Sequence, residues 1–291
     1  MVLKEPGSVL TAPHRRAAVL GSPISHSLSP ALHLAAYRAL GLSHWSYGVH
    51  EMQAPALRRF VAGLGPQWAG LSLTMPLKEA AFEVADEVSD LARRTGAINT
   101  LVRRPDGGWS GDNTDVYGVS QALRGAGCAR VASALVLGSG ATARSVVAAL
   151  ATLGCQRVTF AVRSSARPQT LDQARGAGLE VDVVGLGQVV DRVGDAPLVV
   201  STLPADALGA STATAGLLPE GLRMQGQLLL DVVYAGWPTG LARTFEEAGA
   251  SVVSGFEVLV HQAAEQVHLM TGLPAPVEAM RAAGLASMGS R

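Results

Sequence analysis

The chain has 291 residues, and its 23 lysines and arginines balance its 23 aspartates and glutamates. Hydrophobic residues make up 48% of it and charged residues 16%, a composition that excludes intrinsic disorder for most of the chain. The length favours two domains, and the neutral balance argues against a nucleic-acid partner.

Residues 1–15 are aperiodic, and we expect them to form a flexible tail. From there on, short apolar runs alternate with helical patterns, as is typical of α/β layering. The first strand is predicted at 17–20, and Ser29 is suited to cap a helix over 30–40. We expect further strands at 45–49, 70–73 and 99–103, helices at 54–64 and 78–84, and a hairpin turn at 105–108.

A second unit begins near residue 134 and predicts a parallel sheet. Its strands are expected at 134–137, 157–162, 180–184, 198–201 and 228–232, with helices between them. After Gly255 the pattern becomes helical, with segments at 256–271 and 276–285. The fold class is therefore two-domain α/β.

The motif GSGATA follows the strand at 134–137 and opens a helix, the setting in which a G-x-G-x-x-G/A pattern indicates a dinucleotide site. Gly138 permits the tight turn, Gly140 lets the backbone approach a pyrophosphate, and Ala143 allows close packing. The free N–H groups at the helix start supply an anion site. We expect Gly138, Ser139, Gly140 and Ala141 to bind the cofactor; the alternative is an ordinary strand–turn–helix.

The next strand ends in VTFAVRSSAR, where an NAD-specific site would place a carboxylate. It offers Arg163 instead, followed by Ser164 and Arg167. Arginines suit a ribose 2′-phosphate through charge-assisted hydrogen bonds, so NADP is preferred over NAD. The alternative is that both arginines are solvated surface charges.

Several polar residues stand where packing alone would not require them. Ser27 and Ser29 follow the first strand, and such hydroxyls can bind a carboxylate, although Ser29 could serve only as a helix cap. Thr74 ends a strand, and Lys78 stands near a helix start, which is electrostatically unfavourable. Asp115 begins a helix, where N-capping is its alternative role. A Lys78–Asp115 pair in a cleft could transfer a proton to a carbonyl oxygen.

Five motifs in order carry a resemblance to a known family. They are S-x-S, T-x-P-x-K, A-x-N-T, D-N-T-D and, after the glycine loop, G-x-x-x-L-x-x-Q-A. This order resembles that of the shikimate dehydrogenase family from about residue 17 to about residue 285. The stretches TGAINTL and SGDNTDV are the most specific.

The resemblance implies NADP-dependent reduction of 3-dehydroshikimate to shikimate, in the pathway to aromatic amino acids. It implies that Lys78 and Asp115 are the catalytic pair and that Gly255 lies near the nicotinamide. It also implies a set of substrate-binding residues: Ser27, Ser29, Thr74, Asn99, Tyr234 and Gln262. The implied domains are a substrate domain of residues 16–117 with 256–291, and a Rossmann-type, doubly wound NADP domain of residues 118–255.

Two other functions remain open. A quinate or aminoshikimate dehydrogenase would share the fold and differ only in the ring substituent. A non-catalytic NADP-binding regulator would share it too, but would have no need of Lys78 and Asp115.

The sequence also predicts the location of the protein and the absence of disulfides and of a metal. Two cysteines are too few for a disulfide framework or a four-thiolate zinc site, and no ligand cluster indicates a metal. The chain shows neither a signal peptide nor a run of about 18 apolar residues. We expect a cytoplasmic monomer or homodimer that binds a small-molecule substrate.

Overall fold

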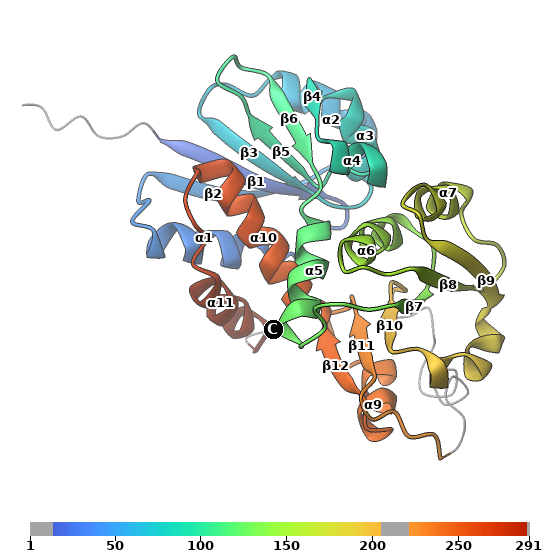
Figure 1. The fold of residues 1–291 in the computed structure, drawn as a ribbon. Coiled ribbons are helices and arrows are strands. Elements are labelled where there is room, and N and C mark those ends of the chain that lie inside the picture. The colour runs from blue at the N-terminus through green and yellow to red at the C-terminus, as the bar shows by residue number, and fades with distance from the viewer. Residues whose placement is uncertain (1–13, 205–220, 290–291) are drawn as a thin grey trace, which may run out of the picture.

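Two six-stranded sheets organise the computed structural model, which describes residues 14–204 and 221–289 (Figure 1). Most of the predicted tail lies outside the described residues, and Arg15 already belongs to the first strand. The two sheets occupy opposite halves of the molecule, joined by a helix in the middle.

The first sheet mixes parallel and antiparallel strands in the order β2-β1-β3-β5-β6-β4. The strands are β1 (Arg15–Gly21), β2 (Trp45–Glu51), β3 (Trp68–Leu73), β4 (Glu87–Val88), β5 (Thr100–Arg103) and β6 (Trp109–Asp112). β1 lies parallel between β2 and β3, and the predicted hairpin turn connects the antiparallel strands β5 and β6. The ends of β1 and β3 therefore lie next to each other.

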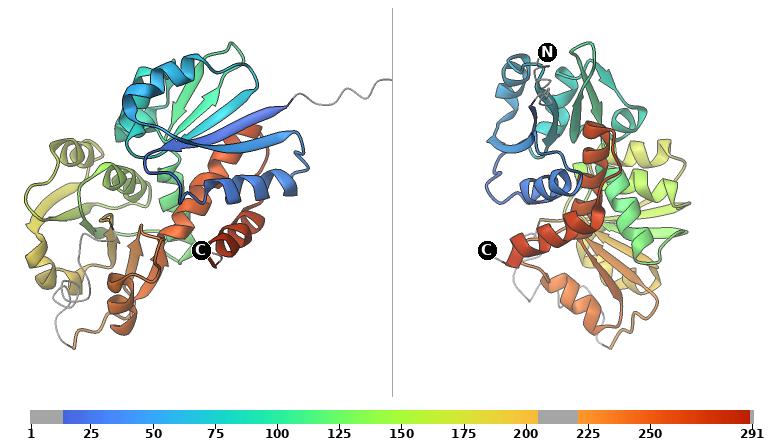
Figure 2. Two further views of the ribbon diagram at one scale, coloured as in Figure 1. Left: turned by 180° about the vertical axis from the view of Figure 1, so that it is seen from behind. Right: turned by 90° about the vertical axis from the view of Figure 1, so that its left-hand side faces the viewer.

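Helices from both ends of the chain cover this sheet. They are α1 (Ser29–Ala39), α2 (Ala54–Ala62), α3 (Leu77–Ala80), α4 (Asp90–Thr95), α10 (Gly255–Thr271) and α11 (Val277–Gly289). Ala18 and Leu20 of β1 pack toward α2, whereas Ala17 and Val19 pack toward α1 and α10, because successive strand residues face opposite ways. Figure 2 shows the C-terminal helices beside α1, as their contacts require.

The second sheet is entirely parallel, in the order β12-β11-β10-β7-β8-β9. Its strands are β7 (Ser133–Leu137), β8 (Arg157–Val162), β9 (Glu180–Gly185), β10 (Leu198–Ser201), β11 (Leu228–Asp231) and β12 (Ser251–Ser254). Counted from β7, this is the 3-2-1-4-5-6 order of doubly wound dinucleotide-binding folds, whose ligands bind where the order reverses, between β7 and β10. The predicted fold class is confirmed.

Helices cover both faces of the second sheet. They are α6 (Ala141–Thr152), α7 (Pro168–Gly176) and α9 (Gly240–Glu247). Val136 of β7 packs in one core with α6, and Leu137 packs on the opposite face with Phe245 of α9. Two 3₁₀ segments, Leu186–Asp191 and Val193–Asp195, follow β9.

Helix α5 (Asp115–Gly125) joins the two halves, since it packs against both α10 and α6. Gly118 allows the approach of α10: a Cβ there would lie 2.6 Å from the carbonyl oxygen of Val258. We propose the division into residues 16–117 with 256–291 and residues 118–255, whose first boundary falls within α5.

Several short elements differ from the prediction. The segment predicted as a helix over 78–84 is one α-helical turn, α3, followed by a 3₁₀ turn at Ala81–Glu83. Asn99 precedes β5 instead of belonging to it. The strands β4 and β12 and the helix α4 were not predicted. Each has two to six residues and no more than two consecutive apolar ones, so neither a hydrophobic period nor an apolar run marks it.

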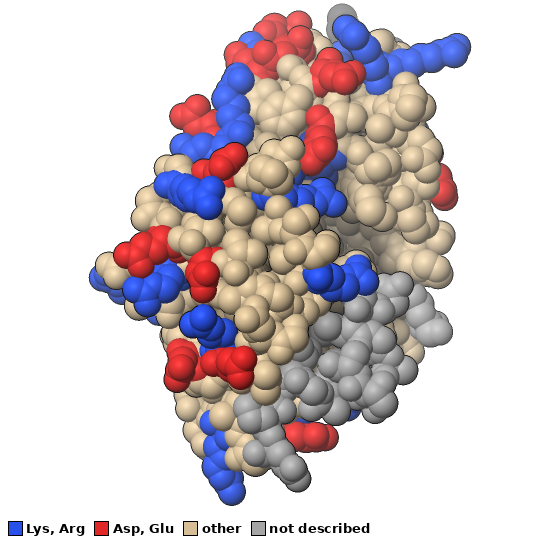
Figure 3. Space-filling view, turned by 90° about the vertical axis from the view of Figure 1, so that its right-hand side faces the viewer, with Lys and Arg blue, Asp and Glu red and all other residues tan. Residues whose placement is uncertain are grey.

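Charged side chains of both signs are interspersed on the face shown in Figure 3, as the equal numbers of acidic and basic residues lead one to expect. Among the described residues, no helix is both long enough and apolar enough to cross a membrane.

Candidate active site

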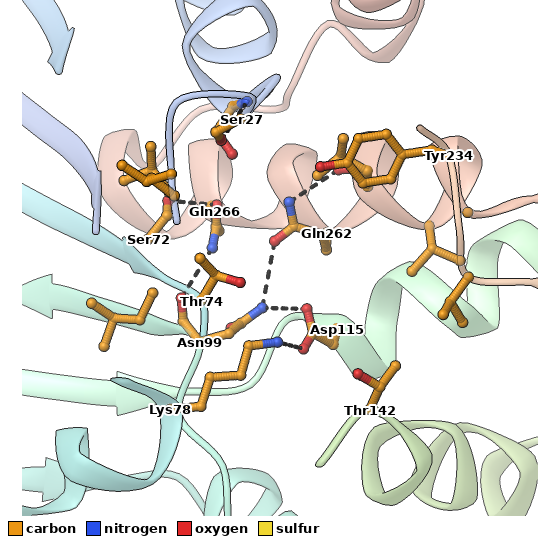
Figure 4. A pocket seen from close by; sticks show the side chains of 18 of the residues that line it. Ser27, Ser72, Thr74, Lys78, Asn99, Asp115, Thr142, Tyr234, Gln262 and Gln266 are labelled. Atoms are coloured by element: carbon orange, nitrogen blue, oxygen red, sulfur yellow. Dashed lines mark hydrogen bonds and ion pairs between the residues drawn. The ribbon is translucent and has the colours of Figure 1, made fainter. Parts of the chain in front are cut away.

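A cavity of about 340 Å³ lies between the two halves, bounded by the ends of β1 and β3 and by the helices α5, α6 and α10 (Figure 4). Side chains from distant parts of the sequence meet there. The predicted residues that line it are Ser27, Ser29, Thr74, Lys78, Asn99, Asp115, Tyr234, Gly255 and Gln262.

Lys78 and Asp115 form an ion pair at the side of the cavity. Lys78 Nζ lies 2.5 Å from Asp115 Oδ2, and the two side chains are 20% and 16% exposed. Lys78 stands on the short helix α3, and Asp115 is the first residue of α5. An ammonium group that is partly shielded but open to a cavity can exchange a proton with a bound carbonyl or hydroxyl group.

Asp115 is not the N-cap of α5, so its alternative role is excluded. Thr114 holds the cap position without a side-chain cap, and the backbone N–H of Asp115 donates to Asn113 Oδ1 at 3.1 Å. The carboxylate instead accepts hydrogen bonds on both oxygens, from Lys78 and from Asn99 Nδ2 at 2.7 Å. The Asp115 side chain is thus held at the cavity rather than at the helix backbone.

The structure corrects the prediction that Ser29 caps α1. The helix begins at Ser29 itself, and no side chain caps it at Leu28. Ser27 Oγ accepts the backbone N–H of Ser29 at 3.3 Å. Ser29 is buried and lies against Tyr47: burial raises the pKa of the Tyr47 phenol, and hydrogen bonds with Ser72 and Ser29 act in the opposite direction. Ser29 therefore belongs to the cavity wall.

Tyr234 reaches the cavity from the segment after β11. Asp231 holds this segment by accepting hydrogen bonds from Thr239 Oγ1 at 2.7 Å and from the backbone N–H of Val233 at 3.2 Å. Burial raises the pKa of the Asp231 carboxyl, and these hydrogen bonds oppose the rise. Gly255 lies opposite, where a Cβ would fall 2.0 Å from the Val232 carbonyl oxygen, so only glycine fits.

The glycine loop fits the pyrophosphate of a dinucleotide. Gly138 has a φ of +96°, which favours glycine, and a Cβ on it would lie 2.7 Å from Thr202 Oγ1. A Cβ on Gly140 would meet no atom within 4 Å, so the backbone there is open to a ligand. The helix α6 begins at Ala141 and directs its free N–H groups at this space. The buried Ser139 hydroxyl accepts the backbone N–H of Arg167 at 3.1 Å, which ties the loop to the segment after β8.

Arg163, Ser164 and Arg167 follow β8, the strand next to β7, and all three are exposed. Among the described residues, the side chains of Arg163 and Arg167 make no hydrogen bond or ion pair with the protein. The two guanidinium groups are therefore available to an anion at this edge of the sheet, and the residues present fit NADP.

The cavity wall also contains polar residues that were not predicted, among them Ser72, Gln266 and Thr142. Ser72 lies on the fully buried strand β3, Gln266 one turn beyond Gln262 on α10, and Thr142 in the first turn of α6. The sequence could have indicated Gln266, because it follows Gln262 by four residues, and residues i and i+4 share a helix face. Thr142 brings the glycine-loop helix to the same cavity as Lys78. Among the described residues, no group of three or more histidines, cysteines or carboxylates could hold a metal ion.

Comparisons with known proteins agree on one family. Residues 19–101 match the family model of the shikimate dehydrogenase substrate binding domain, and residues 255–283 match that of the shikimate 5′-dehydrogenase C-terminal domain. A shikimate dehydrogenase (NADP(+)) from Symbiobacterium thermophilum is 35% identical over 289 residues, which is 97% of either chain.

Solved structures extend the likeness to three dimensions. The shikimate dehydrogenase of Mycobacterium tuberculosis is 45% identical, with a TM-score of 0.83 over 94% of this chain and 99% of that one. The enzyme of Thermus thermophilus in complex with NADP(H) and shikimate is 34% identical, with a TM-score of 0.81 over the same shares.

Proposed function

Because the chain belongs to the shikimate dehydrogenase family, we infer that it is an NADP-dependent oxidoreductase that reversibly reduces 3-dehydroshikimate to shikimate. This reaction is a step of aromatic amino acid biosynthesis. The cytoplasmic location and the monomeric or dimeric state stay predictions.

The position of the ion pair beside the glycine-loop helix is the observation that supports this proposal. The ion pair of Lys78 and Asp115 lines the same cavity as Thr142 of the glycine-loop helix and Gly255. Reduction of a ketone needs a hydride at the carbonyl carbon and a proton at the oxygen. A proton donor and the end of a dinucleotide site therefore have to meet in one cavity, and these residues supply both.

We assign the proton transfer to Lys78 and Asp115. Bound NADPH supplies the hydride. Lys78 Nζ gives a proton to the substrate oxygen as the carbon–oxygen double bond becomes single, and Asp115 holds the ammonium group in place through its 2.5 Å contact. In the reverse direction, Lys78 accepts the hydroxyl proton.

The other residues bind and orient the ring. Ser27 and Ser29, with Thr74 and Tyr234, hold the substrate carboxylate by hydrogen bonds. Asn99 and Gln262 bind ring hydroxyls, Asn99 by exchanging its 3.0 Å hydrogen bond to Thr114 Oγ1 for one to the substrate. The glycine loop from Gly138 to Ala141 holds the pyrophosphate, Gly255 lies near the nicotinamide, and Arg163, Ser164 and Arg167 hold the 2′-phosphate.

The decisive experiment measures NADP-linked oxidation of shikimate and of quinate side by side by the purified protein. We expect a higher kcat/KM for shikimate. A higher value for quinate would move the assignment to the quinate alternative. Activity with neither, despite measurable NADP binding, would favour a regulator.

A further inference from the structure

Two glutamines stand one turn apart on α10, and both line the cavity, but their hydrogen bonds differ. Gln266 Nε2 donates to two oxygens, and Gln266 Oε1 contacts two further polar groups. The four partners are Thr100 Oγ1 at 2.9 Å, the Asn99 carbonyl at 3.3 Å, Ser72 Oγ at 2.7 Å and His33 Nε2 at 3.3 Å. A primary amide has two donors and two lone pairs, so Gln266 has no capacity left for a substrate.

The orientation of the Gln266 amide follows from its partners. The backbone carbonyl of Asn99 can only accept, so Nε2 must face it and Oε1 must face Ser72 and His33. His33 therefore carries its proton on Nε2. It is fully buried, and burial lowers its pKa to about 3, so the ring is neutral.

On the other side, Gln266 holds the Thr100 hydroxyl. Thr100 Oγ1 accepts from Gln266 Nε2 and donates its own proton to Asn99 Oδ1 at 2.7 Å, because an amide oxygen can only accept. The backbone N–H of Thr114 donates to the same Asn99 oxygen at 2.8 Å. With Oδ1 held, Asn99 Nδ2 faces Asp115 Oδ1 at 2.7 Å. A chain of directed hydrogen bonds thus runs from Gln266 through Thr100 and Asn99 to the carboxylate that pairs with Lys78. Figure 4 shows its last part, from Asn99 through Asp115 to Lys78.

Gln262 is the contrasting case. Its Nε2 donates to the carbonyl oxygen of Leu259 at 3.1 Å, and its second N–H has no protein acceptor among the described residues. Its Oε1 receives only longer contacts, at 3.4 Å from Asn99 and 3.5 Å from Thr114. Gln262 can therefore donate to a ligand, whereas Gln266 cannot.

We propose that Gln266 is a positioning residue, which acts through the Thr100 hydroxyl to hold the Asn99 amide against Asp115 and does not bind the substrate itself. This inference rests on the proposed function, because the reaction is what the positioning serves.

The test compares Gln266→Met, Thr100→Val and the double variant, with Gln262→Met as the matched control. We expect each of the first two to lower kcat by roughly 3- to 10-fold, the effect of one lost neutral hydrogen bond, with the KM for shikimate within about twofold of wild type. The double variant should lose no more than the larger single loss, because both substitutions break one chain. Gln262→Met should instead raise the KM for shikimate. When it is combined with Thr100→Val, the two losses of kcat/KM should multiply.

Two results would overturn the proposal. The first is a raised KM with unchanged kcat in Gln266→Met, which would make Gln266 a binding residue. The second is a double variant whose loss of kcat equals the product of the losses in Gln266→Met and Thr100→Val, which would mean that the two residues act independently. If Gln266→Met does not fold, Gln266→Glu replaces it, since that side chain keeps both acceptor contacts and, as a carboxylate, has no donor for Thr100.

A further measurement does not depend on activity. The ¹⁵N spectrum of His33 in the ligand-free protein should report the Nε2–H form; the Nδ1–H form would mean that the Gln266 amide is reversed, and would refute the direction of the chain. Failure of the wild type to oxidise shikimate would overturn the proposed function while leaving this result readable.

Discussion

Lys78 is the residue at which a single substitution should cost the most activity. Lys78→Met keeps most of the length of the side chain but removes the ammonium group that lies 2.5 Å from Asp115. Proton transfer matters mainly in the transition state, so we expect kcat to fall by ~10²–10⁴-fold while the KM for shikimate changes less. Steady-state kinetics with saturating NADP measures both. A kcat within about threefold of wild type, with a raised KM, would make Lys78 a binding residue.

Arg163 should decide between NADP and NAD. Its exposed guanidinium group makes no hydrogen bond or ion pair among the described residues and is free to meet the 2′-phosphate. A hydrogen bond to a charged group contributes roughly 1.5–3 kcal/mol, which is about 10- to 150-fold in affinity. Arg163→Ala should therefore raise the KM for NADP by one to two orders of magnitude and leave that for NAD nearly unchanged.

Arg167→Ala is the comparison for Arg163, and a smaller loss is expected there. Equal proportional loss of NADP-linked and NAD-linked activity in Arg163→Ala would show that Arg163 supports the loop or the adenine and does not distinguish the two cofactors.

Between elements, Arg144 connects the glycine-loop helix to the other half of the molecule. It stands in the first turns of α6, where a cation is unfavourable, yet it is buried. Its guanidinium group donates to the carbonyl oxygens of Thr95 and Gly96 at the end of α4, at 2.6 and 3.1 Å, and to Glu79 at 2.7 Å. The end of α4 carries partial negative charge, so this position favours a cation.

Arg144→Met should lower the free energy of unfolding by roughly 1.5–3 kcal/mol, because it leaves buried carbonyl groups without their charged donor. Urea denaturation measures the loss. Arg58→Met on the exposed side of α2 is the control, since arginine and methionine have similar helix propensity, and its effect should stay within about 0.5 kcal/mol. A loss of that small size in Arg144→Met would mean that water replaces the guanidinium group.

For the whole molecule, His33 should make folding sensitive to acid. Burial lowers its pKa from 6.5 to about 3, so between these values the unfolded chain binds a proton that the native protein does not. The stability that this group contributes is present above pH 6.5 and is lost as the pH falls toward 3, at up to about 1.4 kcal/mol per pH unit. His33→Gln should remove this part of the pH dependence.

Unfolding free energies measured between pH 4 and 7 test the acid effect, with His268→Gln, which removes an exposed imidazole, as the matched control. An unchanged slope in His33→Gln would mean that His33 is protonated in the native state, which would contradict its assignment as a neutral ring.

The sequence by itself determined the local parts of this protein. The glycine loop, the polar residues that follow β1 and β3, and the helix starts at Ala141 and Asp115 depend on near neighbours in the chain, and so they were predictable. Motif order then indicated the family, which the comparisons confirm. The strands β4 and β12 and the helix α4 were missed because none of them contains more than two consecutive apolar residues.

Only the tertiary structure decided which side chains meet. Lys78 and Asp115 are 37 residues apart, and Ser72 and Gln266 are 194 apart. A hydrophobic period shows that a residue faces the core, but not which hydroxyl or amide packs against it from another element. Ser29 shows where local sequence fails to predict a role. Its place before a proline predicted a helix cap, whereas packing against β2 buries its hydroxyl beside Tyr47. Buried polar groups take their partners from the packing of distant segments, so their hydrogen bonds follow from the fold and not from local sequence.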